Sequence, residues 1–179
     1  MNKPLLDILL NMSSSEVRNY ATPGLTSHLI GAGAGKVRLF SADRDTHTHQ
    51  IHPHSHRFDF VCLVLKGQVV NTTFVKRYHI ADDRNSYAVS TLTFNGAFGN
   101  YDFLPGTTPE LFEEVDMFYE TGAFYSMKAN EIHSIEFRKG TEVLFFEGPS
   151  VSRTSVVLEP WSDGARVPTF KTHEWMFQK

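Results

Sequence analysis

Short runs of apolar residues, broken by turn formers, fill most of the chain and predict β-strands. Aromatic and β-branched residues dominate these runs, and glycine, asparagine, aspartate or proline separates most of them. The expected strands cover residues 37–40, 58–65, 68–78, 87–94, 117–127, 134–138, 142–147 and 154–158. Because no strand–helix–strand rhythm connects the runs, we predict an all-β fold, an antiparallel sandwich or barrel, rather than a parallel α/β sheet.

The N-terminal part of the chain follows a different pattern. Residues 4–12 are apolar at helical spacing, and Ser13 to Glu16 then offer a cap for a second short helix that ends near Asn19. We therefore expect one domain, 1–179, with three parts: a mainly helical extension over 1–36, a β-barrel over 37–158 and a C-terminal tail over 159–179.

Length and charge narrow the classes of partner. A chain of 179 residues can bury a core without disulfides or a structural metal, and Cys62 is its single cysteine. A formal net charge of -3 without a basic block argues against nucleic acid or an anionic membrane as partner. The longest apolar runs, such as 60–65, are far shorter than the roughly 20 residues of a membrane helix, and the N-terminus lacks a signal-peptide pattern. We expect a cytoplasmic protein that acts on a small molecule.

Histidines gather in one segment of the chain, which contains His47, His49, His52, His54 and His56. Neutral imidazole is the commonest protein metal ligand, and two imidazoles two positions apart on a strand point to the same side. The pairs His52/His54 and His54/His56 both have this spacing, so the sequence predicts a metal site here with two alternative registers.

Two motifs in order resemble the cupin superfamily. His54 and His56, with Gly67 eleven residues after His56, are similar to the first cupin motif, which is H-x-H, three or four residues, a glutamate, six residues and a glycine. The segment 54–60 also resembles a little-characterised group of bacterial and phage cupins that carry H-x-H-x-aromatic-Asp. The resemblance covers roughly residues 37–158.

The second motif, G-x5-P-x-G-x2-H, is similar to the segment from Gly122 to His133. Lys128 stands in the place of the proline, and Asn130 stands in the place of the second glycine. Because asparagine tolerates the left-handed backbone conformation, we expect Asn130 to supply it as glycine would.

The resemblance implies a jelly-roll β-barrel that holds one divalent metal ion with His54, His56 and His133. The spacing to Gly67 favours this set over one that includes His52. Iron is common in the superfamily, and zinc, nickel and manganese also occur, so Fe(II) is the expected ion. Pairing of sheet edges, usual among cupins, implies a homodimer.

One position departs from the motif. The glutamate that many cupins use as a fourth ligand is replaced by Phe60, which strand alternation puts on the side of His54 and His56, whereas Asp59 should face away. Such a three-histidine site is similar to those of thiol dioxygenases and β-diketone-cleaving dioxygenases. Because its ligands carry no charge, such a site should attract an anionic substrate group more strongly than a site with three histidines and one glutamate.

These features together favour a mononuclear Fe(II) dioxygenase that acts on a small thiol, diketone or organic acid. Two alternatives stay open: an isomerase, epimerase or lyase in which the metal is only a Lewis acid, and a cupin that binds a small molecule without turnover. Tyr125, just before the second motif, and Arg77, at the end of a strand, are the candidate catalytic residues.

Overall fold

The computed structural model describes residues 3–33, 35–47, 51–78, 85–95, 101–162 and 165–166, and most of these lie in strands. The elements are α1 (Lys3–Asn11), β1 (Ser15–Val17), β2 (Leu25–Ala32), β3 (Lys36–Ala42), β4 (Phe58–Lys66), β5 (Gln68–Arg77), β6 (Ser86–Phe94), β7 (Tyr101–Leu104), β8 (Pro109–Glu120), β9 (Phe124–Met127), β10 (Ile132–Phe137), β11 (Glu142–Ser150), β12 (Thr154–Ser162) and β13 (Ala165–Arg166). The predicted all-β fold with a short N-terminal helix is confirmed.

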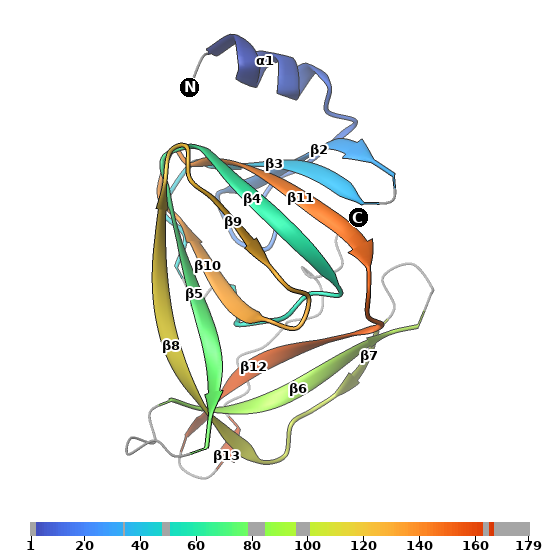
Figure 1. The fold of residues 1–179 in the computed structure, drawn as a ribbon, viewed down its shortest axis with the longest axis vertical. Helices are drawn as coiled ribbons and strands as arrows, with labels where there is room; N and C mark the ends of the chain where they lie inside the picture. The colour runs from blue at the N-terminus through green and yellow to red at the C-terminus, as the bar shows by residue number, and fades with distance from the viewer. Residues whose placement is uncertain are drawn as a thin grey trace.

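The strands form two antiparallel sheets that face each other as a jelly roll. One sheet has the order β1-β2-β3-β11-β4-β9, and the other has the order β10-β5-β8-β6-β12-β13, with β7 beside β6. Figure 1 shows β4, β9 and β11 arching over β10 and β5, while β6, β7 and β12 close one end of the body. The apolar core lies between the sheets and includes Phe60, Val64, Val69 and Val143.

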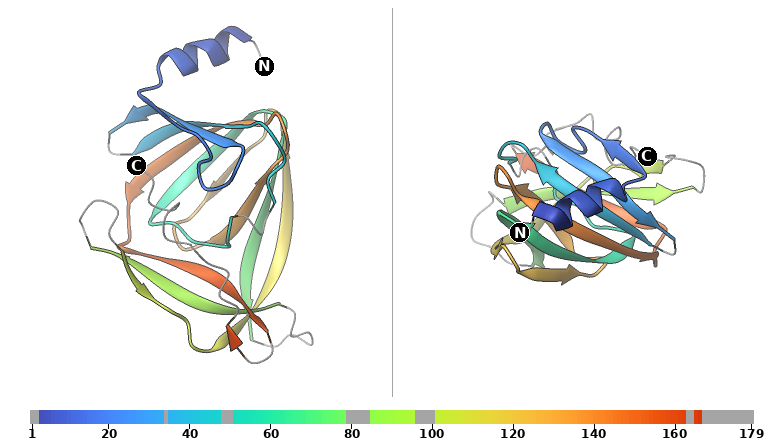
Figure 2. Two further views of the ribbon diagram at one scale, coloured as in Figure 1. Left: turned by 180° about the vertical axis from the view of Figure 1, so that it is seen from behind. Right: turned by 90° about the horizontal axis from the view of Figure 1, so that it is seen from above.

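The helix α1 lies at the opposite end of the long axis from β12 and β13. Figure 2 shows it beyond β2 and β3, on the outside of the body. Leu5 and Ile8 on the helix and Met12 just after it are exposed. No helix of the described ranges is long and apolar enough to cross a membrane.

Residues 53–55 run between β10 and β12, two strands of the second sheet. They precede β4, yet the backbone of His54 exchanges hydrogen bonds with that of His133 on β10, at 2.8 and 3.0 Å. On the other side, Leu158 N donates to Pro53 O at 2.8 Å and Ser55 N donates to Val156 O at 2.9 Å. A histidine in this segment is therefore held by backbone bonds on both sides.

Gly67, the last residue of the first motif, makes the tight turn between β4 and β5. Its φ of +81° is in the left-handed region, and a Cβ there would meet the Thr141 Oγ1 at 2.5 Å and Cα at 2.8 Å. Only glycine fits both the backbone and the space.

We expect Gly67→Ala to lower the free energy of unfolding by more than the roughly 1–2 kcal/mol that a left-handed alanine costs. Gly140→Ala is the matched control, because Gly140 has a φ of +79° and a Cβ added to it would meet nothing within 4 Å. Urea unfolding of both variants separates backbone strain from the steric clash. Equal losses in the two variants would contradict the close approach to Thr141.

The expected second helix and the mainly helical character of 1–36 are wrong beyond α1. Glu16 and Val17 lie in β1 and pair with His28 and Ser27 of β2. A capping pattern is only a local preference, and edge pairing to a sheet outweighs it here. β2 also belongs to the first sheet, so that sheet begins well before residue 37.

Two further boundaries differ from the prediction. The expected strand 117–127 is two strands, β8 and β9, because the chain turns at Gly122, whose φ is +88°. β12 continues through Ser162 and pairs with β13, so the predicted tail begins inside a strand. Residues 167–179 lie outside the described part of the chain.

Candidate metal centre

The structure brings His54, His56 and His133 together. Their ligand nitrogens all lie within 4.8 Å of one another, and the ring centroids are separated by 4.8 to 5.3 Å. His54 and His56 come from the segment before β4, and His133 comes from β10. His54 and His133 are 79 positions apart in the sequence. They meet because the 53–55 segment pairs with β10.

Hydrogen bonds set which ring nitrogens of the group carry lone pairs. The Nδ1–H of His54 donates to the His52 carbonyl at 2.7 Å, and the Nδ1–H of His133 donates to the Asn71 Oδ1 at 2.5 Å. In both rings Nε2 is thereby left as the lone-pair nitrogen. The Nε2 of His56 lies 2.9 Å from that of His133. Imidazole nitrogens with a lone pair are ligands that suit a divalent transition metal.

All three imidazoles are held in the neutral form. Burial, the largest cause, and the neighbouring His54 and His133 rings lower the pKa of His56 well below its usual value. Burial also lowers the pKa of His133 well below the usual value, and it lowers that of His54. Neutral imidazole is the form that binds metal, so protons compete weakly at this site.

These lowered pKa values predict an acid-sensitive apoprotein. Below about pH 6.5, unfolded histidines take up protons that the native ones do not, so unfolding is favoured increasingly as the pH falls. Stability is therefore complete above that pH and should fall towards pH 5 by up to about 1.4 kcal/mol per pH unit for each such histidine. Urea unfolding between pH 5 and 8, with a chelator present, measures this dependence of the stability on pH.

His56→Gln is the matched variant for this measurement, because glutamine cannot take up a proton. Its stability should depend less steeply on pH between 5 and 6.5 than that of the parent protein. Identical slopes would mean that His56 binds a proton equally well in the native and unfolded chains.

Aromatic rings cover one side of the histidine group. Phe60, 3% exposed, has its ring centroid 4.9 Å from that of His56 and 5.4 Å from that of His133. The ring centroid of Phe145 lies 4.9 Å from that of Phe60, and the ring centroid of Phe58 lies 5.1 Å from that of His56. The expected position of Phe60 beside the histidines is confirmed, so an apolar ring stands where many cupins have a carboxylate.

Asp59 faces away from the histidines, as strand alternation predicts, and fastens β4 to the turn of the second motif. Its Oδ1 accepts the Ala129 N–H at 2.9 Å, and its Oδ2 lies 2.7 Å from the Lys128 Nζ. The hydrogen bond from Lys128, the largest cause, lowers the pKa of Asp59. This contact ties the segment that leads into His133 to the strand that follows His56.

The turn itself differs from the expectation for Asn130. Asn19 and Ala21 are the non-glycine residues with positive φ in the described ranges, so Asn130 does not take the left-handed conformation. Instead the Glu131 carboxylate accepts the Lys128 N–H at 2.6 Å, and the Glu131 N–H donates to the Lys128 carbonyl at 3.0 Å. Side-chain bonds close this turn without a glycine.

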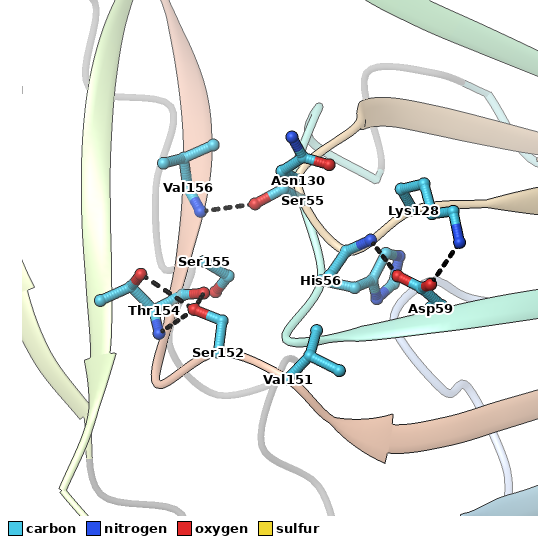
Figure 3. A pocket seen from close by; sticks show the side chains of 11 residues that line it. Ser55, His56, Asp59, Lys128, Asn130, Val151, Ser152, Thr154, Ser155 and Val156 are labelled. Atoms are coloured by element: carbon cyan, nitrogen blue, oxygen red, sulfur yellow. Dashed lines mark hydrogen bonds and ion pairs between the residues drawn. The ribbon is translucent and has the colours of Figure 1, made fainter.

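A pocket of about 390 Å³ opens beside His56. Figure 3 shows His56, Asp59 and Lys128 on one side of it and Ser152, Thr154 and Ser155 on the other. Its remaining lining residues are Ser55, Ala129, Asn130, Val151 and Val156. Of the three histidines, His56 therefore lines a small pocket rich in hydroxyl groups.

Tyr125 is separated from the histidines by the side chain of Phe60. Its ring centroid lies 6.3 Å from that of Phe60, and Tyr119 stacks on it at 4.3 Å. Burial, followed by the neighbouring Cys62, raises the pKa of Tyr125 well above its usual value, so the hydroxyl stays protonated. Burial raises the pKa of Cys62 to about 12, so this buried thiol also stays protonated. A catalytic role for Tyr125 stays a prediction.

Arg77 and His52 are placed differently. Arg77 pairs with Glu113 at the exposed end of β5, six residues and so about 20 Å of strand from Asn71. His52 is buried and is not in the three-histidine group, but its carbonyl holds the His54 ring. His47 is exposed, and His49 lies outside the described residues.

Asn71 is a site residue that the sequence analysis missed. It is 2% exposed in the middle of β5 and contacts His133 through its amide. The signal in the sequence was a single amide in an otherwise β-branched run. A polar group at such a position is buried and needs a partner.

Comparison with known proteins gives structural neighbours only. No protein-family model and no curated protein matches the chain. Streptomyces albus HEPD, solved with 2-hydroxyethylphosphonate and Fe(II) bound, is 15% identical with a TM-score of 0.43, over 76% of this chain and 24% of that one. Hydroxypropylphosphonic acid epoxidase from S. wedmorenis, solved with fosfomycin, is 9% identical with a TM-score of 0.40, over 69% and 50%.

A cupin-2 domain containing protein from Shewanella frigidimarina is 12% identical with a TM-score of 0.37, over 83% of this chain and 93% of that one. The chain spans about a quarter of HEPD and half of the epoxidase. The two sequence motifs and the jelly roll of two antiparallel sheets are together consistent with a member of the cupin superfamily.

Proposed function

We propose that this protein is a mononuclear metal enzyme, an Fe(II) dioxygenase that acts on a small polar thiol, diketone or organic acid. His54, His56 and His133 would hold the metal ion through Nε2. The observation that carries the proposal is the group of three neutral imidazoles whose ligand nitrogens lie within 4.8 Å of one another.

The charge of the site favours an anionic substrate. Three neutral imidazoles leave the double positive charge of the ion uncompensated, and Phe60 adds no carboxylate at the place where many cupins have one. An uncompensated charge in a poorly solvated site attracts an anionic group strongly. A thiolate, enolate or carboxylate supplies that group.

The pocket beside His56 limits the size of the substrate. Its volume of about 390 Å³ fits a small molecule rather than a polymer. Ser152 and Thr154 bring hydroxyl groups, and Lys128 brings an ammonium group that Asp59 neutralises. The pocket can therefore orient a polar molecule by hydrogen bonds while the ion takes its charged end.

The ion would supply redox chemistry with dioxygen, for which Fe(II) is suited and Zn²⁺ is not. The protein's own residues would do the rest. The three imidazoles stay neutral, and the wall formed by Phe58, Phe60 and Phe145 keeps water from one side of the group. Exclusion of water strengthens every electrostatic contact inside the site.

Elemental analysis of tag-free protein, followed by oxygen-uptake assays after Fe(II) loading, tests the proposal. Thiols and β-diketones are the first substrates to screen, and zinc-loaded protein is the control. We expect close to one iron per chain and oxygen uptake that matches product formed. Turnover without oxygen, with zinc as effective as iron, would contradict the dioxygenase and favour the isomerase or lyase.

A further inference from the structure

We propose that Asn71 is a positioning residue, which fixes the Nε2 of His133 as the metal-binding nitrogen, and that Met127 fixes the amide of Asn71 in turn. The inference rests on the proposed function for the ligand role of His133. The orientation of the ring itself does not depend on a metal.

The side-chain contacts of Asn71 join three strands, its own and two others. It lies on β5, two positions from Thr73, which pairs with His133 of β10, so Asn71 is the diagonal neighbour of His133. Its Oδ1 is 2.5 Å from the His133 Nδ1, and its Nδ2 is 3.6 Å from the Met127 Sδ on β9. All three side chains are at least 95% buried, because they are 2, 3 and 5% exposed.

The direction of these bonds follows from the chemistry of the sulfur. A thioether accepts hydrogen bonds and cannot donate, so the amide must turn its NH₂ group towards Met127. The carbonyl Oδ1 then faces His133 and can only accept. The proton of the His133 ring must therefore lie on Nδ1, which leaves the lone pair on Nε2, beside His56.

A neutral amide suits this site better than a carboxylate. It fixes the ring, as outer-sphere partners of metal-binding histidines do, without adding negative charge near the ion. His54 is oriented by a main-chain carbonyl, which is also neutral. The attraction of the centre for an anionic substrate is thereby preserved.

Three variants test the role of Asn71. Asn71→Leu has a similar volume and no acceptor, Asn71→Asp keeps an acceptor, and Val69→Ala on the same strand is a control for stability alone, since Val69 is fully buried away from the described contacts of His133. Zn²⁺ is the probe, measured by competition with a chelator. The tautomer of His133 is read from the ring ¹⁵N chemical shifts of the metal-free protein.

We expect Asn71→Leu to weaken Zn²⁺ binding about 10- to 100-fold and to give His133 a mixture of tautomers. Asn71→Asp should keep the proton on Nδ1, and Val69→Ala should change neither readout. If Asn71→Leu does not fold, Asn71→Ala serves, because it also lacks an acceptor. Met127→Leu should shift the tautomer in the same direction by a smaller amount.

An unchanged tautomer in Asn71→Leu or Asn71→Ala would overturn the inference. Failure of the proposed metal site, on which the ligand role of His133 depends, gives a different result. In that case the parent protein would bind no Zn²⁺, while the ¹⁵N shifts would still report whether Asn71 orients the ring.

Discussion

His133→Ala is expected to lower the affinity of the protein for a divalent metal by more than about 100-fold, beyond the 10- to 100-fold that loss of an outer-sphere partner costs. The variant removes the one ligand that comes from β10, and two imidazoles from a single short segment remain. Its backbone bonds with His54 are untouched, so the fold should persist. Chelator competition with Zn²⁺ and elemental analysis measure the loss, and circular dichroism checks the fold.

His47→Ala is the matched control for this variant. His47 belongs to the same histidine-rich segment but is exposed and outside the three-histidine group. The His47→Ala variant should bind a divalent metal with the same affinity as the parent protein. Full metal content in His133→Ala would show that the second motif does not supply a ligand, and the proposed site would lose its main support.

Phe60→Glu should destabilise the metal-free protein by at least the roughly 3–5 kcal/mol that loss of a buried phenyl ring costs. The new carboxyl group is placed among aromatic rings and neutral imidazoles, where an unpaired charge is strongly unfavourable. A bound divalent ion offsets that charge. Adding Zn²⁺ should therefore raise the thermal midpoint of this variant more than that of the parent protein.

Phe60→Leu separates lost packing from added charge, since it removes ring contacts but introduces no carboxyl group. It should lose less stability than Phe60→Glu and gain no extra benefit from Zn²⁺. Equal melting temperatures for metal-free Phe60→Glu and the parent protein would mean that the side chain at position 60 does not pack against the histidines.

The fold class and the three-histidine group could be predicted because they depend on short-range regularities. Strand alternation alone placed Phe60 beside the histidines and turned Asp59 outward. The spacing of the two motifs singled out His54, His56 and His133, and it separated them from His52. These predictions needed only the period of a strand and the resemblance of two segments.

Other features depend on contacts between distant segments. The helix expected after Ser13 was wrong because Glu16 and Val17 pair with β2, and nothing local to that sequence records the presence of a sheet edge. The role of Asn71 depends on a sulfur 56 positions further along the chain. The left-handed turn expected at Asn130 was wrong because the side chains of Asp59 and Glu131 hold the turn instead.

The placement of the three histidines on two distant segments of the chain has a consequence for the degradation of the protein in a cell. His54 and His56 come from the segment that leads into β4, whereas His133 lies on β10, to which that segment is paired. An ion held by all three would fasten the segment before β4 to β10 and oppose the local opening that proteases need. Degradation would then be slower for the loaded protein than for the empty one, and the cellular abundance of this chain would follow the metal supply.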